Sequence, residues 1–241
     1  MIPKIIHYCW FGRGEKSELM KKCIHSWKEK LPDYQIIEWN EENFDVNQLE
    51  YTKDAYNARK YAFVSDVARV KALYEMGGIY LDTDVEVYQS FDSILNNTCV
   101  LGFEEECYVA TSMMAAIPQF PLFKQFYEIY KNESFLDENG NLNQTTNVRK
   151  LTDMLMKEGL NRKDEYQILS NGITVYPKEY FSPYNYAYRV LNKTEKSICV
   201  HHFEVSWLPK KSKIFRKIKK FSSDLIGLEN TKKIRNLLVR K

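Results

Sequence analysis

Short apolar runs alternate along the chain with longer segments in which apolar residues recur every three or four positions. The short runs predict buried strands, and the longer recurrence predicts amphipathic helices. Strands are expected at residues 4–8, 34–39, 79–81, 99–103, 173–176 and 198–201, and apolar and polar residues alternate over 85–88. Helices are expected at residues 20–31, 55–76, 123–130 and 148–155. Strands and helices that alternate in this order are typical of an α/β fold.

The strongest helical pattern covers residues 55–76, and Gly77-Gly78 is expected to end that helix. Asp66 and Arg69 are three positions apart, so they lie on one face of it. One interpretation is a surface ion pair of little energetic value. The other is a functional site, because a guanidinium is well suited to phosphate oxygens and sugar hydroxyls.

Composition restricts the class of protein. The chain has 241 residues, of which 44% are hydrophobic and 28% are charged, so general disorder is excluded. The sequence contains no run of about 18 apolar residues, so it predicts no transmembrane helix. The N-terminus lacks the pattern of a signal peptide. Five cysteines without a CxxC pair favour free thiols in a reducing cytoplasm.

Charge is distributed unevenly and divides the chain near residue 210. Residues 210–241 carry a net charge of +10, which leaves −7 for residues 1–209. We therefore expect one folded domain over 1–209 and a basic amphipathic helical tail over 210–241. Such a tail is typical of a reversible anchor on an anionic membrane surface. The alternatives are a helix packed on the domain and a nucleic-acid patch, and the shortage of aromatic residues argues against nucleic acid.

Two carboxylates, Asp82 and Asp84, follow directly after the apolar strand at 79–81. Unpaired carboxylates this close raise each other's pKa, and a divalent cation removes that penalty. Carboxylate oxygens suit Mn²⁺ or Mg²⁺. The alternative is a solvated acidic turn.

Two further clusters lie at strand ends. The end of the last strand carries a polar cluster of His201, His202, Glu204 and Ser206. These side chains offer a metal ligand and hydrogen bonds to phosphate. Adjacent histidines on a strand, however, point to opposite sides. Trp10 follows the first strand and either joins the core or stacks on a base.

Several segments together resemble a known family. Five segments resemble the DXD-containing glycosyltransferases of family 32: residues 2–12, 62–69, 77–84, 175–183 and 201–207. That family includes bacterial capsule and O-antigen sugar transferases, and it is similar, more distantly, to the glucosyltransferase domains of the large clostridial toxins. Residues 104–170 match only in outline, and 210–241 lie outside the resemblance.

The resemblance implies a GT-A fold, in which one nucleotide-binding α/β domain has a mixed central sheet. It also implies a UDP-sugar donor, a Mn²⁺ or Mg²⁺ ion and retention of the anomeric configuration. The implied acceptor is a glycan or a lipid-linked saccharide in the synthesis of capsule or other surface polysaccharide. The expected location is the cytoplasm, peripherally at the inner face of the membrane.

The resemblance also implies roles for residues at the donor site. Trp10 would stack on uracil, and Asn40 would lie near the nucleoside. Asp66 and Arg69 would hold hydroxyls of the donor sugar. Ser206 and Trp207 would contact the β-phosphate. Donor selectivity is expected within 103–115 and 144–150.

A second set of roles concerns the metal. Asp82 would contact the ribose or a water on the metal, and Asp84 would ligate the ion. His202 would be the third metal residue, with His201 and Glu204 as alternatives. Asp66, Arg69 and Asp84 are the catalytic residues that the resemblance implies. No nucleophile for a covalent intermediate is evident, which favours attack on the face that the phosphate leaves.

Two other functions compete with this hypothesis. A phosphotransferase of the haloacid dehalogenase type would use Asp82 as its nucleophile. That class needs a later acidic motif, usually an Asp pair, and the chain contains no Asp-Asp dipeptide. The second alternative is a non-catalytic module that binds sugar or membrane.

Overall fold

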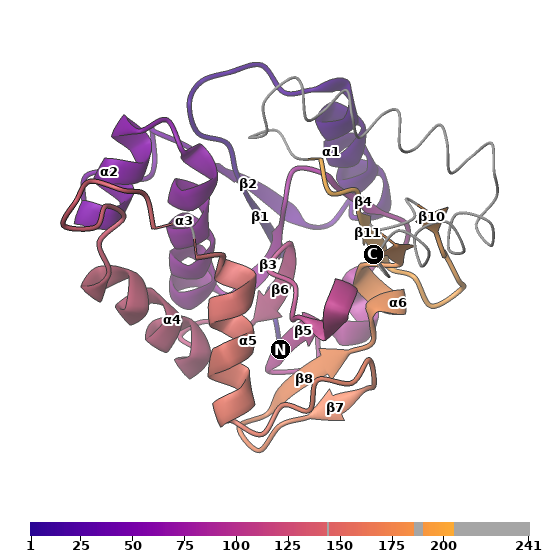
Figure 1. The fold of residues 1–241 in the computed structure, drawn as a ribbon. Helices are drawn as coiled ribbons and strands as arrows, with labels where there is room; N and C mark the ends of the chain where they lie inside the picture. The colour runs from indigo at the N-terminus through magenta and orange to yellow at the C-terminus, as the bar shows by residue number, and fades with distance from the viewer. Residues whose placement is uncertain (144, 186–189, 205–241) are drawn as a thin grey trace, which may run out of the picture.

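The computed structural model describes residues 1–143, 145–185 and 190–204 (Figure 1). Ser206, Trp207 and the predicted tail at 210–241 therefore lie outside the described residues. In the part that is described, no helix is both long enough and apolar enough to cross a membrane. All five cysteines fall within it and carry free thiols.

A mixed sheet lies at the centre. Within the described residues it has seven strands in the order β2-β1-β3-β6-β5-β8-β7. Their bounds are β1 Ile5–Cys9, β2 Gln35–Trp39, β3 Gly78–Leu81, β5 Cys99–Gly102, β6 Met113–Ala116, β7 Gln167–Ile168 and β8 Ile173–Tyr176. β1, β2, β3, β5 and β8 run in one direction, and β6 and β7 oppose them. The carboxyl ends of five strands therefore meet at one edge, where Trp10, Asn40 and Asp82 follow β1, β2 and β3.

Helices cover both faces of this sheet (Figure 1). One core contains side chains of α2 (Glu50–Asn57), α3 (Tyr61–Met76), α4 (Pro121–Asn132) and α5 (Asn147–Lys157). The other core contains Trp27 of α1 (Glu18–Lys30). Ser17 begins α1 by accepting a hydrogen bond from the Met20 N–H.

A second, two-stranded sheet lies beside the first and brings the end of the described chain back to the Asp82-Asp84 turn. β4 (Val85–Val87) pairs antiparallel with β11 (Cys199–His201), and His201 is opposite Val85. The remaining elements are short: two 3₁₀ helices at Phe91–Ile94 and Glu105–Cys107, α6 (Lys178–Phe181), and the pair β9 (Tyr184–Asn185) and β10 (Val190–Leu191).

The structure corrects two sequence predictions. The helix expected over 55–76 is two helices, because Arg59 adopts a φ of 55° and the Lys60 N–H bonds back to the Ala55 carbonyl. No Gly or Pro marks this break. β6, the central strand of the sheet, was not predicted, because Met-Met-Ala-Ala shows no alternation and all four residues are buried.

Candidate active site

Two glycines bring Asp82 to the edge of the sheet. Gly77 (φ 63°) ends α3, and Gly78 (φ 96°) begins β3. A Cβ on Gly78 would lie 2.7 Å from the Ile5 carbonyl oxygen of β1. Only glycine allows this backbone conformation and this approach together. The chain therefore passes directly from α3, which carries Asp66 and Arg69, into the strand that ends at Asp82.

Asp82, Asp84 and His201 form a compact cluster. One ligand atom of each residue lies within 4.8 Å of the others. The His201 Nε2 lies 3.4 Å from Asp84 Oδ2, which also accepts a 2.6 Å hydrogen bond from the Glu204 N–H. The Nδ1 of His201 is buried and has no hydrogen-bond partner among the described residues. Two carboxylates and an imidazole with an unpartnered nitrogen are a donor set that fits Mn²⁺ or Mg²⁺.

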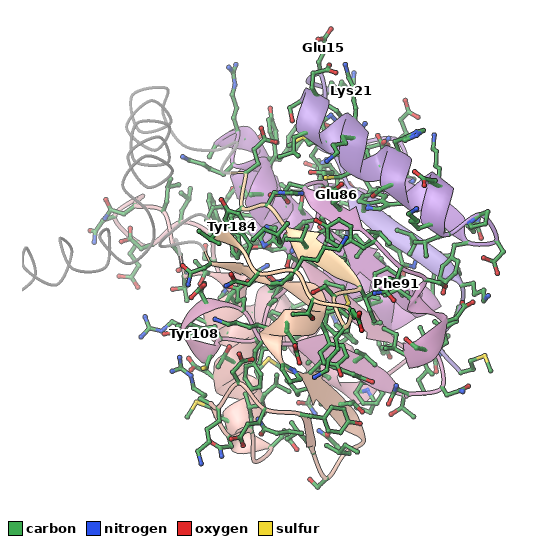
Figure 2. All side chains as sticks on the ribbon, turned by 90° about the vertical axis from the view of Figure 1, so that its right-hand side faces the viewer. Glu15, Lys21, Glu86, Phe91, Tyr108 and Tyr184 are labelled. Atoms are coloured by element: carbon green, nitrogen blue, oxygen red, sulfur yellow. The ribbon has the colours of Figure 1, made fainter. Side chains whose placement is uncertain are left out.

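The structure places His201, not the predicted His202, in this cluster. Adjacent residues at a strand end point to opposite sides. The His202 ring instead lies 2.9 Å from the Glu86 Oε2, and the other carboxylate oxygen of Glu86 binds Lys22 of α1. Figure 2 shows Glu86 next to α1. Glu204, the other alternative, contributes its backbone N–H to Asp84, and its carboxylate accepts from Ser17.

Arg69 links Asp66, predicted to bind the donor sugar, to Asp82 of the predicted metal site. Its side chain is 6% exposed and contacts Asp66 Oδ1 at 3.0 Å and Asp82 Oδ1 at 3.1 Å. It also donates to the Thr111 carbonyl and lies over the Tyr80 ring, 4.5 Å from the centroid. A guanidinium held by this many acceptors is fixed in position. The interpretation of Asp66 and Arg69 as a surface pair is therefore wrong.

Burial and charge set the protonation of these groups. Burial raises the pKa of Asp66 to about 6, although the positive charge of Arg69 opposes this rise. Burial is the largest single effect on Asp84 and disfavours its ionisation, but the charge of His201 and the hydrogen bonds from His201 and the Glu204 N–H together hold the pKa of Asp84 below its usual value. For His201, burial lowers the pKa, but the charges of Asp84 and Asp82 dominate and raise it to about 9.

Three residues of the site were not assigned from the sequence. Tyr80 donates a 2.8 Å hydrogen bond to Asp82, and a strand periodicity of two could have placed both on one face. Asn147, at the start of α5, donates a 2.5 Å hydrogen bond to Asp66. Glu104 follows β5 near His201 and Asp82, and burial raises its pKa to about 7. Asn147 and Glu104 fall in the two ranges where donor selectivity was expected, but no local pattern distinguishes either residue.

The predicted nucleoside residues lie at the same edge. Trp10 is partly buried, its indole N–H donates to the Gly14 carbonyl at 2.7 Å, and the Lys16 ammonium lies 5.3 Å from its ring centroid. The Asn40 amide donates to Glu38 at 3.2 Å and accepts from the Glu42 N–H, so it also shapes its own loop.

Comparisons with known proteins identify a similar sequence family and a similar fold. The family model of the glycosyltransferase sugar-binding region containing a DXD motif matches residues 17–101, which include Asp66, Arg69, Asp82 and Asp84. The fold is also similar to a solved glycosyltransferase involved in the glycosylation of the major capsid of PBCV-1. That similarity has a TM-score of 0.50 and 12% identity, over 92% of this chain and 100% of the other. These matches confirm the predicted resemblance to the DXD glycosyltransferases, over residues 17–101, and the predicted GT-A fold.

Individual relatives share about 30% identity with this chain over part of its length. Inositol phosphoceramide mannosyltransferase 2 of Schizosaccharomyces pombe is 30% identical over 128 residues, which are 52% of this chain and 37% of the relative. Uncharacterized glycosyltransferase L373 of Acanthamoeba polyphaga mimivirus is 29% identical over 204 residues, 77% of this chain and 74% of the relative. The chain spans between 28% and 41% of the length of three Schizosaccharomyces pombe mannosyltransferases that it matches.

Proposed function

We propose that the protein is a metal-dependent glycosyltransferase that moves a sugar from a UDP-sugar to a saccharide acceptor. The observation that carries this proposal is the continuous polar site from Asp66 through Arg69 to Asp82, Asp84 and His201. It lies at the sheet edge where five parallel strands end. In open α/β sheets, this is the edge at which ligands bind. The match to a sugar-binding region supports it further.

The metal would be held by Asp82, Asp84 and His201. When bound, Mn²⁺ or Mg²⁺ neutralises the negative charge that develops on the diphosphate leaving group. The hydrogen bonds from the Glu204 N–H and from His201 hold Asp84 in its ionised form and fix its orientation. Ser206 and Trp207 lie outside the described residues, so their contacts to the β-phosphate stay a prediction.

The donor sugar would lie against Asp66 and Arg69. Among the described residues, both close contacts of Asp66 fall on Oδ1, from Asn147 and Arg69. The Oδ2 atom therefore keeps its acceptor capacity for a sugar hydroxyl. Trp10 and Asn40 at the adjacent strand ends would receive the uridine. Groups fixed before the substrate binds stabilise developing charge without reorganising.

We further propose that transfer retains the anomeric configuration, by attack on the face that the diphosphate leaves. The leaving phosphate would accept the proton of the acceptor hydroxyl. The acceptor would be a glycan or a lipid-linked saccharide in surface polysaccharide synthesis. A relative named for mannose transfer to inositol phosphoceramide supports a lipid-linked acceptor.

The test is hydrolysis and transfer with a panel of UDP-sugars and GDP-sugars, each with Mn²⁺, with Mg²⁺ and with EDTA. We expect turnover of a UDP-sugar that EDTA abolishes and a product with the donor's anomeric configuration by NMR. Asp84→Asn should be inactive, and the exposed carboxylate variant Asp92→Asn should keep wild-type turnover. Turnover unaffected by EDTA, or no turnover of any donor, would refute the proposal. Preference for a GDP-sugar would refute the choice of UDP, and inversion would refute the retaining mechanism.

A further inference from the structure

An ion pair between a buried lysine and a partly buried glutamate lies beside the donor-sugar residue Asp66 and has no role in the proposed mechanism. Lys150 of α5 binds the carboxylate of Glu133, which follows α4, and the Lys150 side chain is only 8% exposed. The Lys150 ammonium also lies 4.6 Å from the centroid of the Tyr130 ring and 5.4 Å from that of Tyr51. Lysine side chains are rarely buried this deeply, because transferring the charge from water is costly unless specific interactions compensate for it.

The two aromatic rings restrict where the ammonium can move. Ring faces attract a cation, and this attraction grows when water is excluded. The hydroxyls of Tyr51 and Tyr130 are themselves buried and have no hydrogen-bond partner among the described residues. Lys150 is therefore held by one carboxylate and two rings, and a displaced ammonium would lose all three contacts at once.

The same helix carries a residue into the donor-sugar site. Asn147 is the first residue of α5, and Lys150 follows three positions later on the same face. Asn147 donates to Asp66 Oδ1, which Arg69 also contacts. Because a helical turn moves as a unit, the position of Lys150 determines where Asn147 meets Asp66.

A second contact holds α5 but does not fix its first turn. The Val109 N–H donates to the Thr152 hydroxyl at 3.0 Å, and Leu151 and Leu155 lie in the core. These contacts lie further along the helix than Lys150. Of these contacts, the ion pair with Glu133 lies nearest to Asn147 along the helix.

We propose that the Lys150–Glu133 ion pair is a positioning device for the donor sugar. It holds the first turn of α5 so that Asn147 and Arg69 together fix the Asp66 carboxylate. Its loss therefore weakens recognition of the sugar and leaves recognition of the nucleotide intact. This inference rests on the proposed function, because it assigns the sugar to Asp66.

The test uses the full chain and compares Lys150→Met, Lys150→Arg and the double variant Lys150→Met/Glu133→Met. The single Met variant leaves the partly buried Glu133 carboxylate without its cation and is expected to lose stability. Replacing both charges by apolar groups removes that penalty, so the double variant keeps the fold measurable. Lys131→Met on α4 is the matched control, because Lys131 is 44% exposed and pairs with Glu128. Measurements are thermal unfolding, UDP affinity with Mn²⁺ by calorimetry, and kcat/KM for the nucleotide sugar that the wild type turns over.

We expect the double variant to unfold within a few degrees of wild type and to bind UDP within threefold. Its kcat/KM for the nucleotide sugar should fall at least tenfold, and Lys150→Arg should keep most of the activity. Lys131→Met should match wild type in all three measurements. A double variant with wild-type kcat/KM overturns the inference while leaving the proposed function standing, and so does an equal loss of UDP affinity and kcat/KM. A wild-type protein that turns over no nucleotide sugar overturns both.

Discussion

His201 and His202 are neighbours in the chain but have different chemical surroundings. His201 faces Asp84 and Asp82, whereas His202 faces Glu86 and the side of β4 next to α1 (Figure 2). The difference arises from the pairing of β11 with β4, which fixes the direction of each side chain. Because neighbouring residues at a strand end point to opposite sides, a shift of one position along the motif exchanges one chemical environment for the other.

This geometry gives a prediction for the metal. Asp84→Asn and His201→Ala should each lower Mn²⁺ affinity by at least about 100-fold, since losing even an outer partner of a ligand costs roughly 10–100-fold. The side-chain carbonyl that Asp84→Asn introduces can still accept the Glu204 N–H, so the fold should persist. His202→Ala is the matched control and should change Mn²⁺ affinity little. Calorimetric titration of Mn²⁺ in the presence of UDP measures this, and equal losses for the two histidine variants would contradict the assignment.

Trp10 gives a second prediction for single residues. Its ring is partly exposed at the end of β1, so its removal leaves most of the core intact. If the ring stacks on the base, Trp10→Ala should weaken UDP binding by about 1–3 kcal/mol, or roughly 5–150-fold. The melting temperature should change by only a few degrees. A large loss of melting temperature with unchanged UDP affinity would show that Trp10 belongs to the core instead.

At the scale of elements, His7 connects three segments. It is fully buried on β1, accepts from the Trp39 indole N–H of β2 at Nδ1, and donates from Nε2 to the Gly77 carbonyl before β3. An indole only donates and a carbonyl only accepts, so these contacts require the neutral imidazole. Burial disfavours the charged ring and lowers the pKa of His7 to about 4.

Stability should consequently fall as His7 is forced to bind a proton. Between pH 6.5 and pH 4 the unfolded chain binds this proton and the folded chain does not, so the free energy of unfolding rises with pH in that window. A pKa difference from 6.5 to about 4 limits the effect to roughly 3 kcal/mol. Urea unfolding at pH 7 and pH 5 should show a larger decrease for wild type than for His7→Gln. Identical pH dependence in both proteins would contradict a neutral, buried His7.

At the scale of the whole molecule, the separate motifs become one site. The site takes its residues from three segments that are distant in sequence: 66–84, 147 and 201. The central sheet and the two-stranded β4–β11 sheet beside it bring them together. Charge also differs across the chain, with −7 over residues 1–209 and +10 over 210–241. The basic tail lies outside the described residues.

We propose that this tail binds anionic membrane surfaces. Each basic residue near such a surface contributes about 1 kcal/mol, and this attraction weakens as salt screens it. Full-length protein should float with liposomes that contain an anionic phospholipid at low salt, and flotation should decline at high salt. A chain that ends at Pro209 should not float. Equal flotation of both chains, or of neither, would contradict the anchor.

Local sequence patterns specify most of the elements and the principal chemical groups. Apolar periodicity located β1, β3, β8 and α1 to within about two residues, because burial of one face leaves a local pattern. The Asp82–Asp84 pair was visible for the same reason, since it directly follows a buried strand. Other features depend on distant partners: the strand β6, the contact of Asn147 with Asp66 and the choice of His201 over His202. Such partners leave no periodicity in the residues themselves, so their effects are fixed only when the sheet assembles.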